Sequence, residues 1–87
     1  MQPYTPKSAT ILIVEDDATS AYLIRTSLSK AGYTNIEIAE SGQETLKKAK
    51  TIVYDLVLLD LFLPDFDGYQ ICKELKQEFP KLKILVT

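Results

Sequence analysis

The stretch DLVLLDLFLPDFDG, residues 55–68, holds the main information about the fold. Four apolar residues, Leu56 to Leu59, lead directly into Asp60, and a turn-forming segment with Pro64 and Gly68 follows. A short continuous apolar run is typical of a strand that is covered on both faces of a parallel sheet. The pattern therefore predicts a buried strand that delivers a carboxylate at its carboxyl end.

The same arrangement occurs nearer the amino terminus, where the apolar run 11–14 is followed by Glu15 and Asp16. The period then changes to that of a helix over residues 17–31, and Gly32 is placed to end it. The residues of this segment that fall on one apolar stripe are Ala21, Ile24, Leu28 and Ala31.

The middle of the chain predicts an edge strand and a second helix. Residues 36–38 alternate between apolar and charged, which is typical of a half-exposed strand. A helix is expected from Gln43 to about Ile52, with lysines on its outer face. We expect its inward side chains to be Leu46, Ala49 and Val53, and its outward ones to be Lys47, Lys48 and Lys50.

The remaining segments complete an alternating pattern of strands and helices. A third helix is expected over residues 68–78, ended by Pro80, and a fourth strand over 82–87. The inward residues of that helix are expected to be Ile71, Cys72, Leu75 and Phe79. The order β-α-β-α-β-α-β calls for a doubly wound α/β fold, with a parallel sheet and right-handed crossovers. With the alternating strand at an edge, the simplest strand order is 2-1-3-4.

Three carboxylates meet in this arrangement, from Glu15, Asp16 and Asp60. Neighbouring strands lie ~4.8 Å apart, so their carboxyl ends bring these groups together in the expected ligand crevice. Two carboxylates at about 4 Å repel by about 4 kcal/mol at an effective dielectric near 20, which favours a bound cation. Single Asp residues, such as Asp17, more often cap helices or form turns. Acids on two different strands instead favour a Mg²⁺ site with phosphoryl chemistry on a carboxylate.

Composition excludes several other classes of function. The 87 residues make one domain or less, and a net charge of −2 gives no argument for nucleic acid. No apolar run exceeds four residues, far short of the roughly 20 that span a membrane. The chain has no histidine and a single cysteine, Cys72, so a zinc site is not expected and a reducing, cytoplasmic location is consistent. Residues 1–8 are expected to be a flexible tail ahead of a domain that covers 9–87.

The chain resembles the receiver domain of bacterial two-component response regulators. The resemblance rests on ILIVEDD, GYTNIEIAESGQETL, DLVLLDLFLPDFDG and KILVT, which follow one another in order and cover nearly the whole chain after the tail. It implies a flavodoxin-like fold; the five-stranded 2-1-3-4-5 order of such domains is a property of that family. It also implies a phospho-acceptor signalling domain rather than an enzyme, supplied by a histidine kinase or phosphotransfer protein.

The resemblance also implies roles for individual residues. Asp60 matches the phospho-acceptor, Asp16 the direct Mg²⁺ ligand, and Glu15 the acid that acts through a metal-bound water. Phe62 matches the residue whose backbone carbonyl binds the metal, and Thr87 the hydroxyl that bonds the phosphoryl group and shifts on activation. The resemblance further implies that Pro64 and Gly68 shape the loop after the acceptor.

One departure from the family is large, because its fourth helix, fifth strand with a terminal lysine, and fifth helix have no match here. Lys81 and Lys83 precede the fourth strand and cannot replace that lysine. We therefore expect impaired phosphorylation of these 87 residues, an uncovered sheet face over residues 11–14 and the central strands, and a homo-oligomer that covers it.

Two alternatives remain. The first is a receiver-like interaction module that is not phosphorylated. The second is a phosphatase of the haloacid dehalogenase type, which requires an Asp two places after the nucleophile, where this chain has Phe62.

Overall fold

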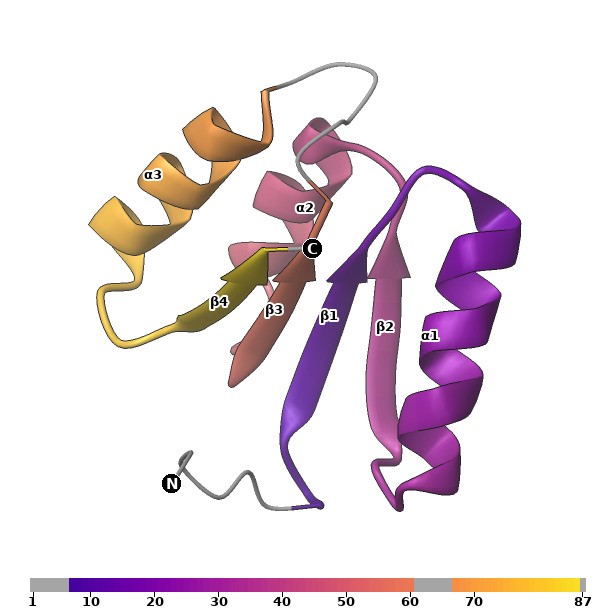
Figure 1. Ribbon diagram of the computed structural model, residues 1–87. Coiled ribbons are helices and arrows are strands. Elements are labelled where there is room, and N and C mark those ends of the chain that lie inside the picture. Colours follow the sequence, from indigo (N-terminus) through magenta and orange to yellow (C-terminus); the bar gives the residue numbers. More distant parts are fainter. Residues whose placement is uncertain (1–6, 61–66, 87) are drawn as a thin grey trace.

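The computed structural model describes residues 7–60 and 67–86. Strands and helices alternate along the chain, as the sequence predicts (Figure 1). In order, they are β1 (Thr10–Val14), α1 (Ala18–Lys30), β2 (Asn35–Ala39), α2 (Gly42–Ala49), β3 (Leu56–Leu59), α3 (Gly68–Glu78) and β4 (Lys83–Val86). The four strands form one parallel sheet in the order β2-β1-β3-β4, which confirms the predicted α/β fold and strand order.

Helices cover both faces of this sheet, as expected of a doubly wound fold. Side chains alternate between the faces of a strand, so Leu12 and Val14 face one side and Ile11 and Ile13 the other. The first side forms the main core with α2 and α3, whereas α1 packs against β1 on the second. The members of the main core include Leu12, Val14, Ala39, Ala49, Val57, Leu59, Ile71 and Leu75.

Coverage of the sheet is uneven, and it differs from the expectation of an uncovered face at residues 11–14. Ile11 and Ile13 are fully buried because α1 packs against β1. Exposure instead increases toward β4. Leu56 and Leu58 of β3 are only half-buried, so this strand is not covered equally on both faces, and Leu85 of β4 is 58% exposed.

Helix α1 ends at Lys30, and Gly32 lies just beyond its C-cap, which confirms the prediction that Gly32 stops the helix. Gly32 has φ 104°, a backbone conformation that residues other than glycine rarely adopt. The Tyr33 N–H donates to the Leu28 carbonyl at 3.1 Å and the Gly32 N–H to the Ser29 carbonyl at 3.0 Å. These two bonds form a Schellman motif, which satisfies carbonyls that the helix leaves open. Ala31 is the exposed C-cap rather than part of the inward stripe.

Helix α2 ends at Ala49, three residues before the predicted end at Ile52. The Lys48 carbonyl accepts bonds from the N–H groups of Thr51 and Ile52, at 3.0 and 2.9 Å, and from the Thr51 hydroxyl. These bonds close the last turn, and residues 50–52 then form a turn outside the helix. The prediction that Val53 points inward is therefore wrong: its side chain is 88% exposed, and Tyr54 is buried instead.

None of the helices in residues 7–60 and 67–86 is long and apolar enough to cross a membrane.

Candidate functional site

The carboxylates of Glu15, Asp16 and Asp60 meet at the carboxyl end of the sheet. One oxygen from each side chain can be chosen so that all three lie within 4.8 Å of one another. Asp16 is exposed, whereas Glu15 and Asp60 are half-buried, so the cluster is open to solvent on one side. This convergence is what the sequence predicts from the ends of two neighbouring strands.

Backbone hydrogen bonds fix the two strand ends that carry these acids. The Asp60 N–H donates to the Val14 carbonyl at 3.0 Å, which continues the β1–β3 ladder by one residue beyond the pair Val14 and Leu59. On the other side of β1, the Glu15 N–H donates to the Ala39 carbonyl at 3.0 Å. Glu15 is thus bonded to β2 and Asp60 to β1, which holds their side chains together at the carboxyl end of the sheet.

Burial, together with the neighbouring acids, raises the proton affinity of Glu15. Desolvation is the main cause that raises the pKa of Glu15 above its usual 4.5, and the charge and hydrogen bonding of Asp60 raise it further. The charge of Asp16 adds to the increase, while a hydrogen bond from the Asp17 N–H opposes it. Like charges held together favour the protonated form unless a cation is present.

Two neighbouring acids cap helices instead of joining the cluster. Asp17 is the N-cap of α1, where its carboxylate accepts the Ser20 N–H at 2.9 Å and the Ser20 hydroxyl at 2.7 Å. The Ser20 hydroxyl and N–H lower the pKa of Asp17. Asp67 caps α3 in the same way, accepting the Tyr69 N–H at 2.9 Å. Their roles are those typical of Asp next to a helix.

The other predicted site residues are only partly described. Phe62, Pro64 and Thr87 lie outside the described residues, as do residues 1–6 of the expected tail. Gly68 is the buried first residue of α3, directly after the N-cap. Lys83 begins β4, at the end of the sheet opposite the acidic cluster, so it does not approach the three carboxylates.

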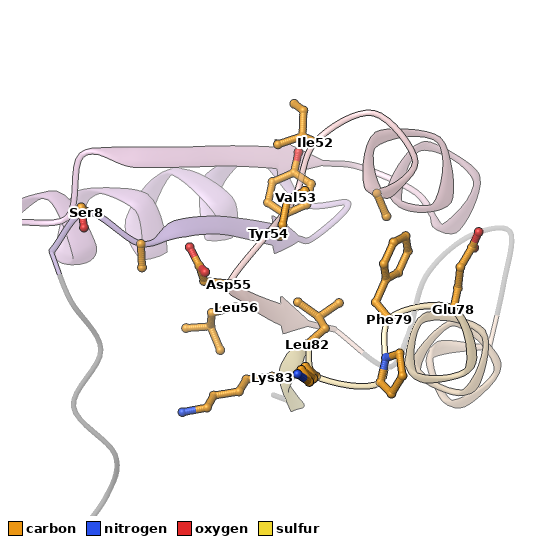
Figure 2. Close-up of a pocket in the computed structure, with 14 residues that line it drawn as sticks. Ser8, Ile52, Val53, Tyr54, Asp55, Leu56, Glu78, Phe79, Leu82 and Lys83 are labelled. Carbon is orange, nitrogen blue, oxygen red and sulfur yellow. The ribbon is translucent and has the colours of Figure 1, made fainter.

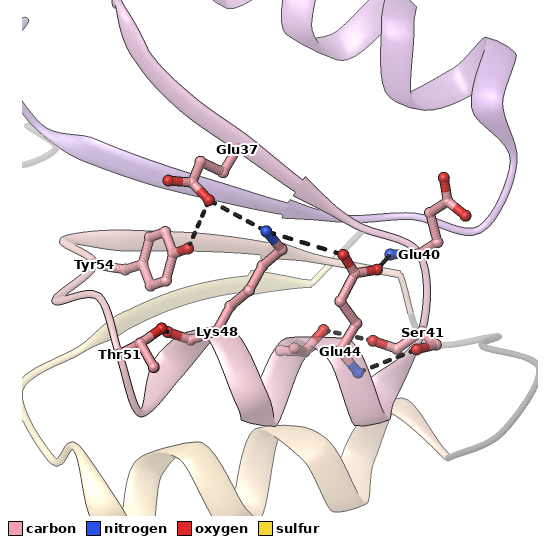
Figure 3. A network of polar contacts seen from close by, with 8 residues as sticks. Glu37, Glu40, Ser41, Glu44, Lys48, Thr51 and Tyr54 are labelled. Atoms are coloured by element: carbon pink, nitrogen blue, oxygen red, sulfur yellow. Dashed lines mark hydrogen bonds and ion pairs between the residues drawn. The ribbon is translucent and has the colours of Figure 1, made fainter.

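A polar network beside the site was missed by the sequence reasoning, which placed Lys48 on a solvated face (Figure 3). Lys48 is half-buried; its ammonium lies 3.3 Å from a Glu37 carboxylate oxygen and 3.9 Å from Glu44. The Tyr54 hydroxyl donates to the same Glu37 oxygen at 3.3 Å, and burial, together with Glu37, raises the pKa of Tyr54 to about 12. The SxxE spacing of Ser41 and Glu44 indicates the start of α2, but it carries no signal for the contacts with Glu37.

We expect the metal-free chain to lose stability as the pH rises above about 4.5. The folded state holds the Glu15 proton more tightly than the unfolded state does, because the pKa of Glu15 is raised on folding. This stabilisation is complete below the unfolded pKa and disappears as the pH rises through the folded pKa. Urea denaturation with a chelator should show the decline, and Glu15→Gln should reduce it. An exposed control, Glu78→Gln, should keep the wild-type slope; an unchanged slope in Glu15→Gln would contradict the cluster's electrostatics.

Known proteins resemble this chain in sequence and in fold. The family model for the response regulator receiver domain matches residues 11–87. The alkaline phosphatase synthesis transcriptional regulatory protein PhoP of Bacillus subtilis is 40% identical over 76 residues, which cover 87% of this chain and 31% of that protein. Response regulator ArlR of Staphylococcus aureus is 38% identical over 77 residues, covering 88% and 35%. The chain thus spans about a third of the length of these relatives.

Solved structures show the same fold. The response regulator TrrA from Thermotoga maritima, in complex with Mg²⁺ and beryllium fluoride, matches with a TM-score of 0.86 and 35% identity, over 90% of this chain and 67% of that one. The chemotaxis response regulator CheY4 of Vibrio cholerae matches with a TM-score of 0.84 and 27% identity, over 91% and 67%. The acidic cluster therefore lies on a fold that is shared with these regulators.

Proposed function

Because the chain belongs to the response regulator receiver domain family, we propose that Asp60 accepts a phosphoryl group from the phosphohistidine of a histidine kinase or phosphotransfer protein. The observation that carries the proposal is the meeting of Glu15, Asp16 and Asp60 within 4.8 Å, at the ends of adjacent strands. The role is that of a signalling module, whose chemistry consists of gaining and losing this group.

The three carboxylates fit a Mg²⁺ ion by their donor type and their openness. Mg²⁺ prefers oxygen ligands, uses one or two carboxylates and keeps several waters, which suits a cluster that is partly exposed. We propose that Asp16 and Asp60 bind it directly and that Glu15 binds through water. When bound, the ion neutralises charge on the phosphoryl oxygens. TrrA, with the same fold, was solved as a complex with Mg²⁺ and beryllium fluoride, which supports this assignment.

The chain itself supplies the nucleophile and its orientation. A carboxylate oxygen of Asp60 forms the new P–O bond while the P–N bond to the donor histidine breaks, and the electron pair leaves with the imidazole. The bond from the Asp60 N–H to the Val14 carbonyl holds the acceptor at the carboxyl end of the sheet, where a donor can approach from solvent. We also assign the Phe62 carbonyl to the metal, the Thr87 hydroxyl to a phosphoryl oxygen, and loop shaping to Pro64 and Gly68, on the family resemblance.

The proposed partners follow from the relatives that the chain matches. PhoP and ArlR are named as regulators, and the chain covers only about a third of each. We propose that these residues act within the cytoplasm as the phosphorylated part of such a regulator, with an output domain or partner protein downstream. We also propose that the 87-residue chain forms a homo-oligomer, because β4 lies at the sheet edge with Leu85 and Val86 exposed.

Labelling with a small phosphodonor tests this function. Acetyl phosphate should add one phosphoryl group, detected by intact mass and removed by hydroxylamine, only when Mg²⁺ is present. Metal stabilisation of several kcal/mol predicts at least about a hundredfold difference in rate between Mg²⁺ and chelator. We expect slow labelling, because Lys81 and Lys83 lie too far from Asp60 to pair with the phosphoryl group. A complete absence of label with Mg²⁺ would instead favour an interaction module that is not phosphorylated.

A further inference from the structure

The peptide group between Ala39 and Glu40 is held at both ends, and it connects α2 to the acidic cluster. Its carbonyl accepts the Glu15 N–H at 3.0 Å. Its N–H donates to a carboxylate oxygen of Glu44 at 2.8 Å, a bond that Figure 3 shows. The other oxygen of Glu44 lies 3.9 Å from the Lys48 ammonium. A continuous set of contacts therefore runs from Lys48 through Glu44 and one peptide group to Glu15.

The position of the Glu44 carboxylate differs from that in an ordinary helix cap. In a capping box, the acid at the third helical position bonds the N–H of the N-cap residue itself. Here Ser41 is the N-cap and its hydroxyl accepts the Glu44 N–H at 3.1 Å, which is the usual half of the motif. The Glu44 carboxylate reaches one residue further back, to Glu40, which directly follows the last residue of β2. Its bond thus restrains the end of the strand as well as the helix.

A carboxylate on this N–H should strengthen the bond at the other end of the same peptide group. Hydrogen bonds to an ionised acceptor are stronger than neutral ones. Bonds in a chain also polarise one another, so the Ala39 carbonyl becomes a better acceptor for the Glu15 N–H. The Lys48 ammonium, 3.9 Å from Glu44 and 3.3 Å from Glu37, holds the Glu44 carboxylate between α2 and β2 and so helps to fix its direction.

We infer that Glu44 is a positioning residue for the cation site. It fixes the backbone of Glu15 through the peptide group 39–40, and so keeps the Glu15 carboxylate beside Asp16 and Asp60. This inference rests on the proposed function, since it assigns Glu44 a role in the affinity for Mg²⁺. Glu44 itself does not belong to the cluster of three acids and does not touch the reacting atoms.

Two measurements on four chains test the inference: wild type, Glu44→Gln, Glu44→Ala and the control Ser41→Ala. The control removes the side-chain bond that caps the same helix but keeps the Glu44 carboxylate. The first measurement is the exchange rate of the Glu15 amide hydrogen in the metal-free chain, relative to the other β1 amides. The second is the Mg²⁺ dissociation constant from calorimetry. Neighbours that orient metal ligands typically affect affinity by 10–100-fold, and we expect about tenfold weaker binding in Glu44→Ala, because it acts through one intervening peptide.

The expected order of the variants separates a positioning role from general support of the helix. Relative exchange at Glu15 and the Mg²⁺ dissociation constant should rise in Glu44→Ala, rise less in Glu44→Gln, which keeps a neutral oxygen acceptor, and stay within about twofold of wild type in Ser41→Ala. Equal effects of Glu44→Ala and Ser41→Ala, or no effect of Glu44→Ala on either measurement, would overturn the inference. If wild type binds no Mg²⁺, the proposed function fails, and amide exchange alone decides whether Glu44 fixes the Glu15 backbone.

Discussion

Phosphoryl labelling of the chain should fall at least about a hundredfold when Asp60 is replaced by asparagine. The amide has nearly the same shape as the carboxylate, but it lacks the charge and the lone-pair basicity that make the oxygen a nucleophile. A hundredfold loss corresponds to about 2.7 kcal/mol of transition-state stabilisation, a modest demand for removal of the attacking group. Acetyl phosphate with Mg²⁺, followed by intact-mass measurement, gives the labelled fraction directly.

The control for this variant comes from the other end of the same strand. Asp55 precedes β3, and its carboxylate accepts the Thr10 N–H at 2.8 Å, far from the acidic cluster. Asp55→Asn should therefore keep the wild-type labelling rate even if it lowers stability. Label that persists at the wild-type level in Asp60→Asn, or that disappears equally in Asp55→Asn, would contradict the assignment of Asp60 as the acceptor.

The position of Asp60 shows how a buried strand delivers a reactive group. Leu59 is fully buried and pairs with Val14, while the next residue on each strand, Asp60 or Glu15, is only half-buried. The apolar run on each strand ends where solvent reaches the sheet, so the acids that follow are accessible at the same place. The backbone bonds at Val14 and Ala39 keep the carboxyl ends of these neighbouring strands in register.

The sequence was sufficient for the features that depend on local pattern. The apolar runs predict the interior strands β1 and β3, and the alternating segment predicts that β2 lies at an edge. Because parallel strands point the same way, the same pattern predicts that Glu15, Asp16 and Asp60 lie together. Val53 could not be placed correctly, because α2 ends at Ala49 and a turn over residues 50–52 separates Val53 from the helix. The ion pairs of Lys48 depend on how β2 packs against α2, which the helical period alone does not show.

Strand β4 offers both unpaired backbone groups and exposed apolar side chains for self-association. It is an edge strand of the sheet, where unpaired backbone groups can bond to another chain. Leu85 is 58% exposed and Val86 46% exposed, one on each face of the strand. A pocket of about 730 Å³ lies at the amino end of the strands, between β4, α3 and the segment before β3 (Figure 2).

The 87-residue chain is therefore expected to self-associate at micromolar concentrations, most simply as a twofold dimer that pairs its β4 edges. Light scattering across a dilution series measures the dissociation constant. Leu85→Lys should raise that constant about tenfold or more, because burying a leucine contributes about 1.5–3 kcal/mol and each 1.4 kcal/mol is a factor of ten. Leu23→Lys is a matched control: Leu23 is also 58% exposed but lies on α1, so its replacement should leave association unchanged. A wild-type chain that stays folded and monomeric, or equal effects of the two lysine variants, would show that β4 is not the self-association surface.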